Sequence, residues 1–127
     1  MLLVVDTSVL IDHLRGDRRA ADRLRGAVEA GDELWSVTPV RTEILAGARP
    51  EEEPLIVTLL GQLRWVDVTV DLADAAGRLA ATFLRSHPGV DTVDYLIAAG
   101  AQEVGAQLLT LNVRHFPMFP GLEPAYG

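Results

Sequence analysis

The first residues constrain the fold of this chain more than any other stretch. Leu2 to Val5 form a short, unbroken apolar run rich in β-branched residues, which predicts a strand covered on both faces. The run stops at Asp6, and Thr7 or Ser8 can then cap a helix, so the chain is expected to turn directly from strand into helix. An acid at this point either lines a ligand site at the carboxyl end of the strand or merely supports the turn, and this segment alone leaves both possibilities open.

The rest of the chain alternates helices and strands. Thr38 followed by Pro39 predicts a helix N-cap with proline at the first helical position, and Gly105 is expected to end the last helix. The alternation predicts one α/β domain over residues 1–127, a three-layer α/β/α fold with a mostly parallel central sheet. The expected helices cover residues 17–30, 40–48, 55–63, 71–85 and 91–105, and the later strands cover residues 34–37, 65–68 and 108–111.

Composition excludes several classes of chemistry. The chain has no cysteine, which excludes disulfides, zinc–thiolate sites and thiol nucleophiles, and its eleven basic residues are all arginine, which excludes P-loop and Schiff-base mechanisms. The net charge of −7 argues against broad attraction to nucleic acid but allows an enzyme that acts on it. No apolar run is long enough for a membrane span and no leader is visible, so we expect a cytoplasmic protein without membrane association.

Four polar side chains are expected at one edge of the sheet. Asp6 ends the first strand, Glu43 follows the second, Asp94 opens a helix and Asn112 ends the last strand. Asp91 is placed to cap the helix that Asp94 opens, because the two acids are spaced as in a capping box. Clustered carboxylates repel one another unless a cation is present, and oxygen donors favour Mg²⁺ or Mn²⁺.

Four fragments in this order resemble a known family, the PIN-domain ribonucleases, and within it the VapC toxins of bacterial toxin–antitoxin pairs. The fragments lie at residues 4–8 (VVDTS), 40–44 (VRTEI), 94–99 (DYLIAA) and 109–116 (LTLNVRHF). The resemblance extends over nearly the whole chain. It implies a PIN-like fold and a metal-dependent endoribonuclease.

The resemblance also assigns roles to individual residues. It implies that Asp6, Glu43 and Asp94 are the acidic trio that binds Mg²⁺ or Mn²⁺ and catalyses hydrolysis of an RNA phosphodiester. Asn112 stands where many relatives carry a fourth acid, which puts tight binding of a second metal in doubt, and Asp91 is an additional candidate ligand besides its capping role. Polar residues matching positions near the acids would orient the ligands or bound water: Thr7, Ser8 and Thr110.

The family resemblance also implies binding partners. The family implies an RNA substrate, a homodimer and a small VapB-like antitoxin that blocks the acidic pocket. The basic residues near the predicted edge, which are candidates for holding the RNA backbone, are Arg15, Arg41, Arg114 and His115. The three histidines, His13, His87 and His115, show no metal-ligand spacing and are expected at the surface.

Two other functions are compatible with the pattern. The first is a catalytically silent PIN-like scaffold that binds a partner, for which the apolar helices at residues 55–63 and 72–84 would serve. The second is a receiver-type signalling domain, which also places aspartates at the strand ends of a parallel sheet. Receiver domains depend on a lysine, and this chain has none.

Overall fold

The computed structural model describes residues 1–127 and contains a sheet of four parallel strands. The strands lie in the order β3-β2-β1-β4, so β1 and β2 are central and the first strand pairs with both the second and the last. Val4 and Val5 are fully buried, as expected for a central strand with helices on both faces. The strand bounds are Leu2–Val5 for β1, Glu33–Val37 for β2, Arg64–Val66 for β3 and Gln107–Leu109 for β4.

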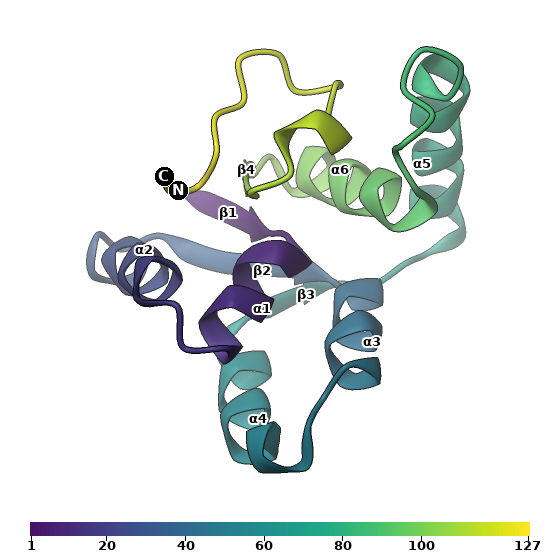
Figure 1. The fold of residues 1–127 in the computed structure, drawn as a ribbon. Helices are drawn as coiled ribbons and strands as arrows, with labels where there is room; N and C mark the ends of the chain where they lie inside the picture. Colours follow the sequence, from purple (N-terminus) through teal and green to yellow (C-terminus); the bar gives the residue numbers. More distant parts are fainter.

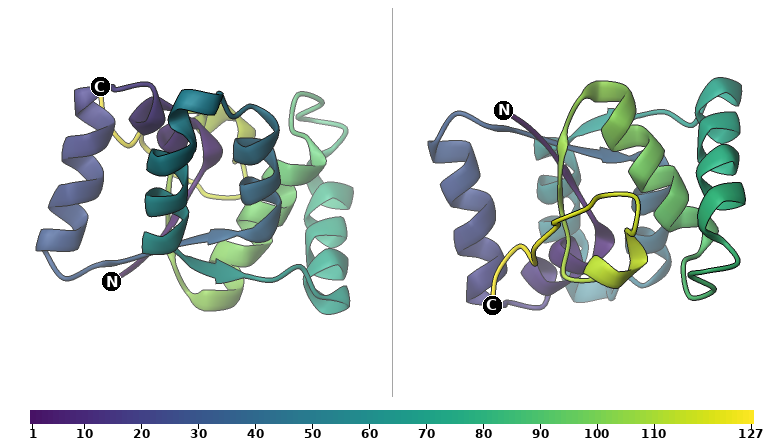
Figure 2. Two further views of the ribbon diagram at one scale, coloured as in Figure 1. Left: turned by 90° about the horizontal axis from the view of Figure 1, so that it is seen from below. Right: turned by 90° about the horizontal axis from the view of Figure 1, so that it is seen from above.

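Helices cover both faces of the sheet, which confirms the predicted three-layer α/β/α arrangement (Figures 1 and 2). One face carries α1 (Thr7–Leu14), α2 (Arg18–Glu29), α3 (Thr38–Ala46) and α4 (Glu53–Gln62). The other face carries α6 (Thr92–Val104), which contacts β1, β2 and β4, and α5 (Val70–Phe83) packs against α6. The chain also contains two short 3-10 helices, η1 (Pro50–Glu52) and η2 (Val113–His115).

A glycine allows α6 to approach the sheet closely. A Cβ atom built on Gly100 would overlap Cγ1 of Val37 in β2, so no larger residue fits without a shift of backbone or core. Gly100 is flanked by buried Ala99 and Ala101. This close approach fixes the distance of α6 from Val37, the last residue of β2.

Several predicted element boundaries shift by one or two residues. The prediction that Thr7 or Ser8 caps α1 is wrong, because the helix already begins at Thr7 and both hydroxyls bind other residues. Thr38 is not the cap of α3 either, since it is the first helical residue and Val37 occupies the cap position. Strand β3 ends at Val66 and β4 at Leu109, earlier than expected.

Both ends of α6 agree with the prediction. Asp91 occupies the N-cap and forms a reciprocal capping box with Asp94. Gly105 ends the helix with a left-handed backbone, φ 70°, which glycine adopts without strain. No helix of the structure has both the length and the apolar character needed to cross a membrane.

Candidate active site at the carboxyl edge of the sheet

The predicted acidic trio comes from three different elements at one edge of the sheet. Asp6 follows β1 directly, and Glu43 lies in α3, which begins immediately after β2. Asp94 is in the first turn of α6. Because all four strands are parallel, their carboxyl ends lie at the same edge, as the sequence pattern predicts.

Asp6 is held by two hydroxyl groups. Its side chain is only 4% exposed, and its Oδ2 accepts hydrogen bonds from Ser8 Oγ at 2.8 Å and from Thr110 Oγ1 at 2.7 Å. The backbone N–H groups of Leu111 and Asn112 donate to these hydroxyls in turn, at 3.2 and 2.9 Å. The network therefore fixes Oδ2 and leaves Oδ1 without a hydrogen-bond donor from the protein.

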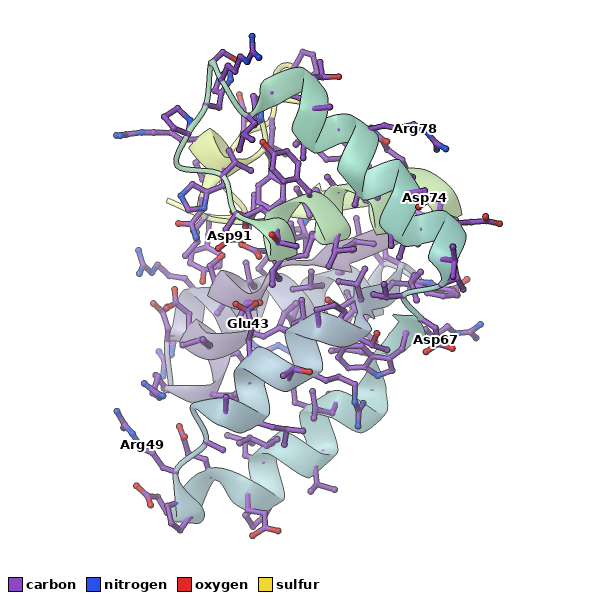
Figure 3. All side chains as sticks on the ribbon, turned by 90° about the vertical axis from the view of Figure 1, so that its right-hand side faces the viewer. Glu43, Arg49, Asp67, Asp74, Arg78 and Asp91 are labelled. Atoms are coloured by element: carbon purple, nitrogen blue, oxygen red, sulfur yellow. The ribbon has the colours of Figure 1, made fainter.

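Glu43 shows the same division of its two oxygens. Thr7 Oγ1 donates a hydrogen bond to Glu43 Oε1 at 2.7 Å, while Oε2 has no partner from the protein. The side chain is exposed, and Figure 3 shows it on the same side of the molecule as Asp91 at the start of α6. Because Thr7 directly follows Asp6, this hydrogen bond ties Glu43 to the Asp6 end of the edge.

Asp94 is buried and carries a perturbed pKa. Its Oδ2 accepts the Asp91 N–H at 3.1 Å, and its own N–H donates to Asp91 Oδ1 at 3.0 Å. Nδ1 of His115 lies 3.2 Å from the same Oδ2. The pKa of Asp94 is raised to about 6, mainly by burial and also by the negative charges of Asp91 and Asp6, while the Asp91 N–H and His115 oppose the shift.

The donor set has the chemistry of a site for a hard divalent cation. Each of the three acids presents one oxygen bound by the protein and one without a donor, and none of these free oxygens is completely buried. In this arrangement, however, no group of three or more His, Cys, Asp or Glu side chains lies close enough to hold one ion. The charge of Asp6 does act on Asp94, so these two carboxylates are neighbours.

The remaining predicted ligands lie at the rim of the site. Asn112 is exposed and follows the end of β4 instead of ending the strand, and its side chain makes no hydrogen bond. Asp91 is also exposed, and its Oδ1 is occupied by the capping interaction. Both residues are therefore exposed, whereas Asp6 and Asp94 are buried.

The four basic residues that were candidates for holding an RNA backbone differ in their surroundings. Arg15 Nε donates to Glu52 Oε2 at 3.0 Å, and the guanidinium of Arg41 lies 4.7 Å from the ring centroid of Trp65. His115 contacts Asp94, a long-range contact that no sequence signal indicates. Only Arg114 is exposed without an acidic or aromatic partner.

None of the three histidines is fully exposed, although all three were expected at the surface. His13 is partly buried, its Nδ1 has no hydrogen-bond partner, and burial lowers its pKa. His115 is partly buried against Asp94. The reason in both cases is packing between segments far apart in the sequence, which residue spacing does not encode.

The fold and the edge define a class of protein, a parallel α/β domain with carboxylates at the carboxyl edge of its sheet. The chain belongs to the PIN domain family, whose pattern matches residues 3–118. Among curated proteins, it is 47% identical over 123 residues to Ribonuclease VapC19 of Mycobacterium tuberculosis, a match that covers 97% of this chain and 98% of that protein. This agrees with the family resemblance of the four sequence fragments.

Solved structures share the fold at lower identity. VapBC2 from Rickettsia felis, crystallised with a DNA fragment from its promoter, aligns with a TM-score of 0.80 at 18% identity and covers 96% of each chain. A toxin–antitoxin complex from Klebsiella pneumoniae aligns with a TM-score of 0.76 at 24% identity and covers 98% of each chain. At these identities, the matches establish the fold.

Proposed function

We propose that residues 1–127 form a single PIN-like domain that is a divalent-metal-dependent endoribonuclease of the VapC type. Membership of the PIN domain family and 47% identity to a ribonuclease support the activity. The observation that carries the proposal is the shared arrangement of Asp6, Glu43 and Asp94, each with one oxygen held by the protein and the other free. A receiver-type function has no support, because the chain lacks lysine and belongs to another family.

The three acids would have different roles in metal binding and proton transfer. Asp6 and Asp94 would hold Mg²⁺ or Mn²⁺ through their free oxygens, and Glu43 would bind the ion directly or through water. When bound, such an ion lowers the pKa of a water molecule and offsets negative charge on the phosphate. The free Oε2 of Glu43 would bind the ion or accept a proton from the attacking water.

The residues around the acids orient them. Ser8 and Thr110 fix Asp6 Oδ2, and Thr7 fixes Glu43 Oε1. Hydroxyl donors of this kind restrict the rotation of a ligand, so that its free oxygen keeps one direction. Asp91 supports Asp94 through the capping box. We assign Asn112 a peripheral place, because its exposed amide is neutral and has no supporting hydrogen bond.

The activity is tested with Asp6→Asn, which removes the carboxylate charge with little change in shape. Purified wild-type protein is expected to cleave RNA only when Mg²⁺ or Mn²⁺ is added, and Asp6→Asn is expected to lose this cleavage while its circular dichroism spectrum stays unchanged. Asp74→Asn, an exposed acid on α5 (Figure 3), is the matched control and should cleave like the wild type. Equal cleavage by Asp6→Asn, free of contaminating nuclease, would refute the assignment.

We further propose a homodimeric toxin that is neutralised by a small VapB-like antitoxin in the cytoplasm. The structural similarity to a toxin–antitoxin complex supports this pairing. So do the exposed apolar side chains on α4 and α5, which are Leu55, Val57 and Val70. Loss of RNA cleavage upon addition of the neighbouring gene product is the expected result, and undiminished cleavage in a stable complex would contradict it.

A silent binding scaffold is the second candidate. One observation favours it: no three acidic or histidine side chains converge within reach of one ion in this arrangement. Calorimetry distinguishes the two functions. Absence of saturable Mn²⁺ binding together with absence of RNA cleavage would support the scaffold, whereas metal binding that depends on Asp6 would exclude it.

A further inference from the structure

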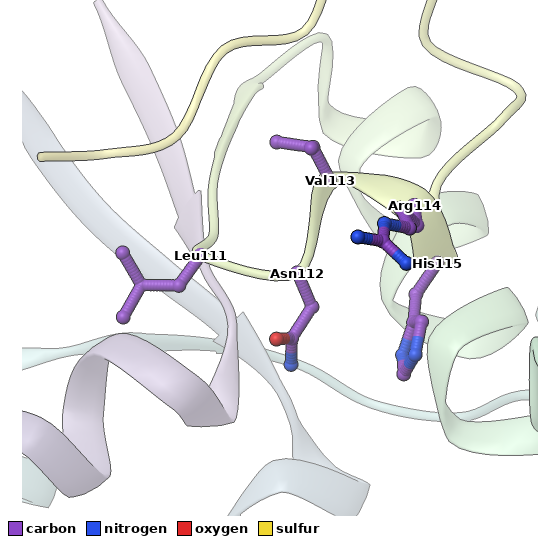
Figure 4. Close-up of a pocket in the computed structure, with 5 residues that line it drawn as sticks. All are labelled: Leu111, Asn112, Val113, Arg114 and His115. Atoms are coloured by element: carbon purple, nitrogen blue, oxygen red, sulfur yellow. The ribbon is translucent and has the colours of Figure 1, made fainter. Parts of the chain in front are cut away.

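A hollow lies beside the acidic edge, along the segment that follows β4. It has a volume of about 430 Å³ and is lined by Leu111, Asn112, Val113, Arg114 and His115 (Figure 4). Its volume falls in the range of pockets that take small ligands or parts of larger ones. Figure 4 shows the side chains of Asn112 and His115 pointing to the same side of the segment.

This hollow adjoins two of the acids. His115 contacts Asp94 across 3.2 Å, and Thr110, the residue before the segment, donates to Asp6 at 2.7 Å. The segment itself is anchored, because Phe116 is 1% exposed and packs in the core. A group bound in the hollow would therefore lie next to the place where the proposed chemistry occurs.

The charged side chains around the hollow indicate the kind of ligand that it would bind. The protein has a net charge of −7 and the neighbouring acids repel a phosphate, so a polyanion needs a local cation at this point. Arg15, Arg41 and His115 already have partners, namely Glu52, the ring of Trp65 and Asp94. Arg114 is exposed and unpaired, and its planar fork of donors matches phosphate oxygens.

We propose that the Leu111–His115 segment binds the backbone of the RNA strand, with Arg114 contacting a phosphate that neighbours the one to be cleaved. This inference rests on the proposed ribonuclease function, but it concerns binding and is tested separately from cleavage. The contact is a point of attraction to the backbone and does not read the base sequence.

The test measures RNA binding without cleavage. A fluorescein-labelled single-stranded RNA is titrated with protein in EDTA, and the dissociation constant is followed by anisotropy across a salt series. Arg114→Gln should weaken binding by about fivefold and reduce the slope of log K against log salt by about 0.7, the value of one phosphate contact on a single strand. Arg114→Lys, which keeps the charge, should retain most of the slope.

Arg18→Gln is the matched control. Arg18 is also exposed and forms no ion pair, but it lies beyond the far end of α1 from Asp6. Binding by this variant should equal that of the wild type. Equal losses in Arg114→Gln and Arg18→Gln, or no loss in either, would overturn the inference.

Cleavage kinetics separate this inference from the proposed function. With Mg²⁺ present, Arg114→Gln is expected to raise KM while kcat changes less than about twofold, because a phosphate contact away from the reacting bond binds substrate and transition state alike. A fall in kcat at constant KM would contradict the binding role. If the wild type binds RNA through Arg114 but does not cleave it, the proposed function fails and only the role of Arg114 in binding the RNA backbone stands.

Discussion

Thr110→Val tests how the protein positions Asp6. The substitution keeps the shape of a side chain that is completely buried, but it removes the hydroxyl that donates to Asp6 Oδ2 at 2.7 Å and accepts the Asn112 N–H at 2.9 Å. A hydrogen bond to a charged group contributes about 1.5–3 kcal/mol, and the loss of the acceptor for Asn112 adds roughly 1 kcal/mol. We expect the free energy of unfolding to fall by about 2.5–4 kcal/mol, which a domain with about 5–15 kcal/mol of stability tolerates.

The same variant should bind metal more weakly. With only the Ser8 hydroxyl remaining on Asp6, the carboxylate gains rotational freedom, and loss of such a supporting partner typically weakens metal binding by about 10–100-fold. Urea unfolding measures the stability and calorimetry with Mn²⁺ measures the affinity. Thr58→Val is the control, since Thr58 is exposed and its hydroxyl bonds only to the carbonyl of Pro54 within α4. Unchanged Mn²⁺ affinity in Thr110→Val would refute the positioning role.

Two further predictions concern stability. The pKa of Asp94 is raised to about 6, so the native metal-free protein binds more protons than the unfolded chain between about pH 4 and 6, and its stability should fall as pH rises through that range. Asp94→Asn should remove this dependence of stability on pH. At pH 7 the variant should be more stable than the wild type by about 1–2 kcal/mol after allowance for solvent screening. Thermal unfolding in EDTA at several pH values measures both effects. Gly100→Ala should cost about 1–3 kcal/mol through the overlap with Val37, and urea unfolding indistinguishable from wild type would mean that α6 does not approach β2 so closely.

The sequence was sufficient to predict the layers and the edge where the acids lie. The apolar run before Asp6 and the alternation of strands and helices are local patterns, and parallel connectivity then brings the strand ends to one side. The capping box of Asp91 and Asp94 is also local, and it was predicted correctly.

Contacts between distant segments were beyond prediction. The pairing of Arg15 with Glu52 depends on how α1 packs near η1, which residue spacing does not reveal. The contact of His115 with Asp94 likewise depends on the path of the chain after β4.

The proposed activity depends on one divalent ion being held by acids from three separate elements. Calorimetric titration of Mn²⁺ into wild-type protein, Asp6→Asn and the surface control Asp74→Asn measures this most directly. We predict saturable binding by the wild type and by Asp74→Asn, and at least a tenfold weaker affinity in Asp6→Asn, because a neutral amide replaces a charged ligand. Equal affinities in all three proteins, or no binding by the wild type, would contradict the account.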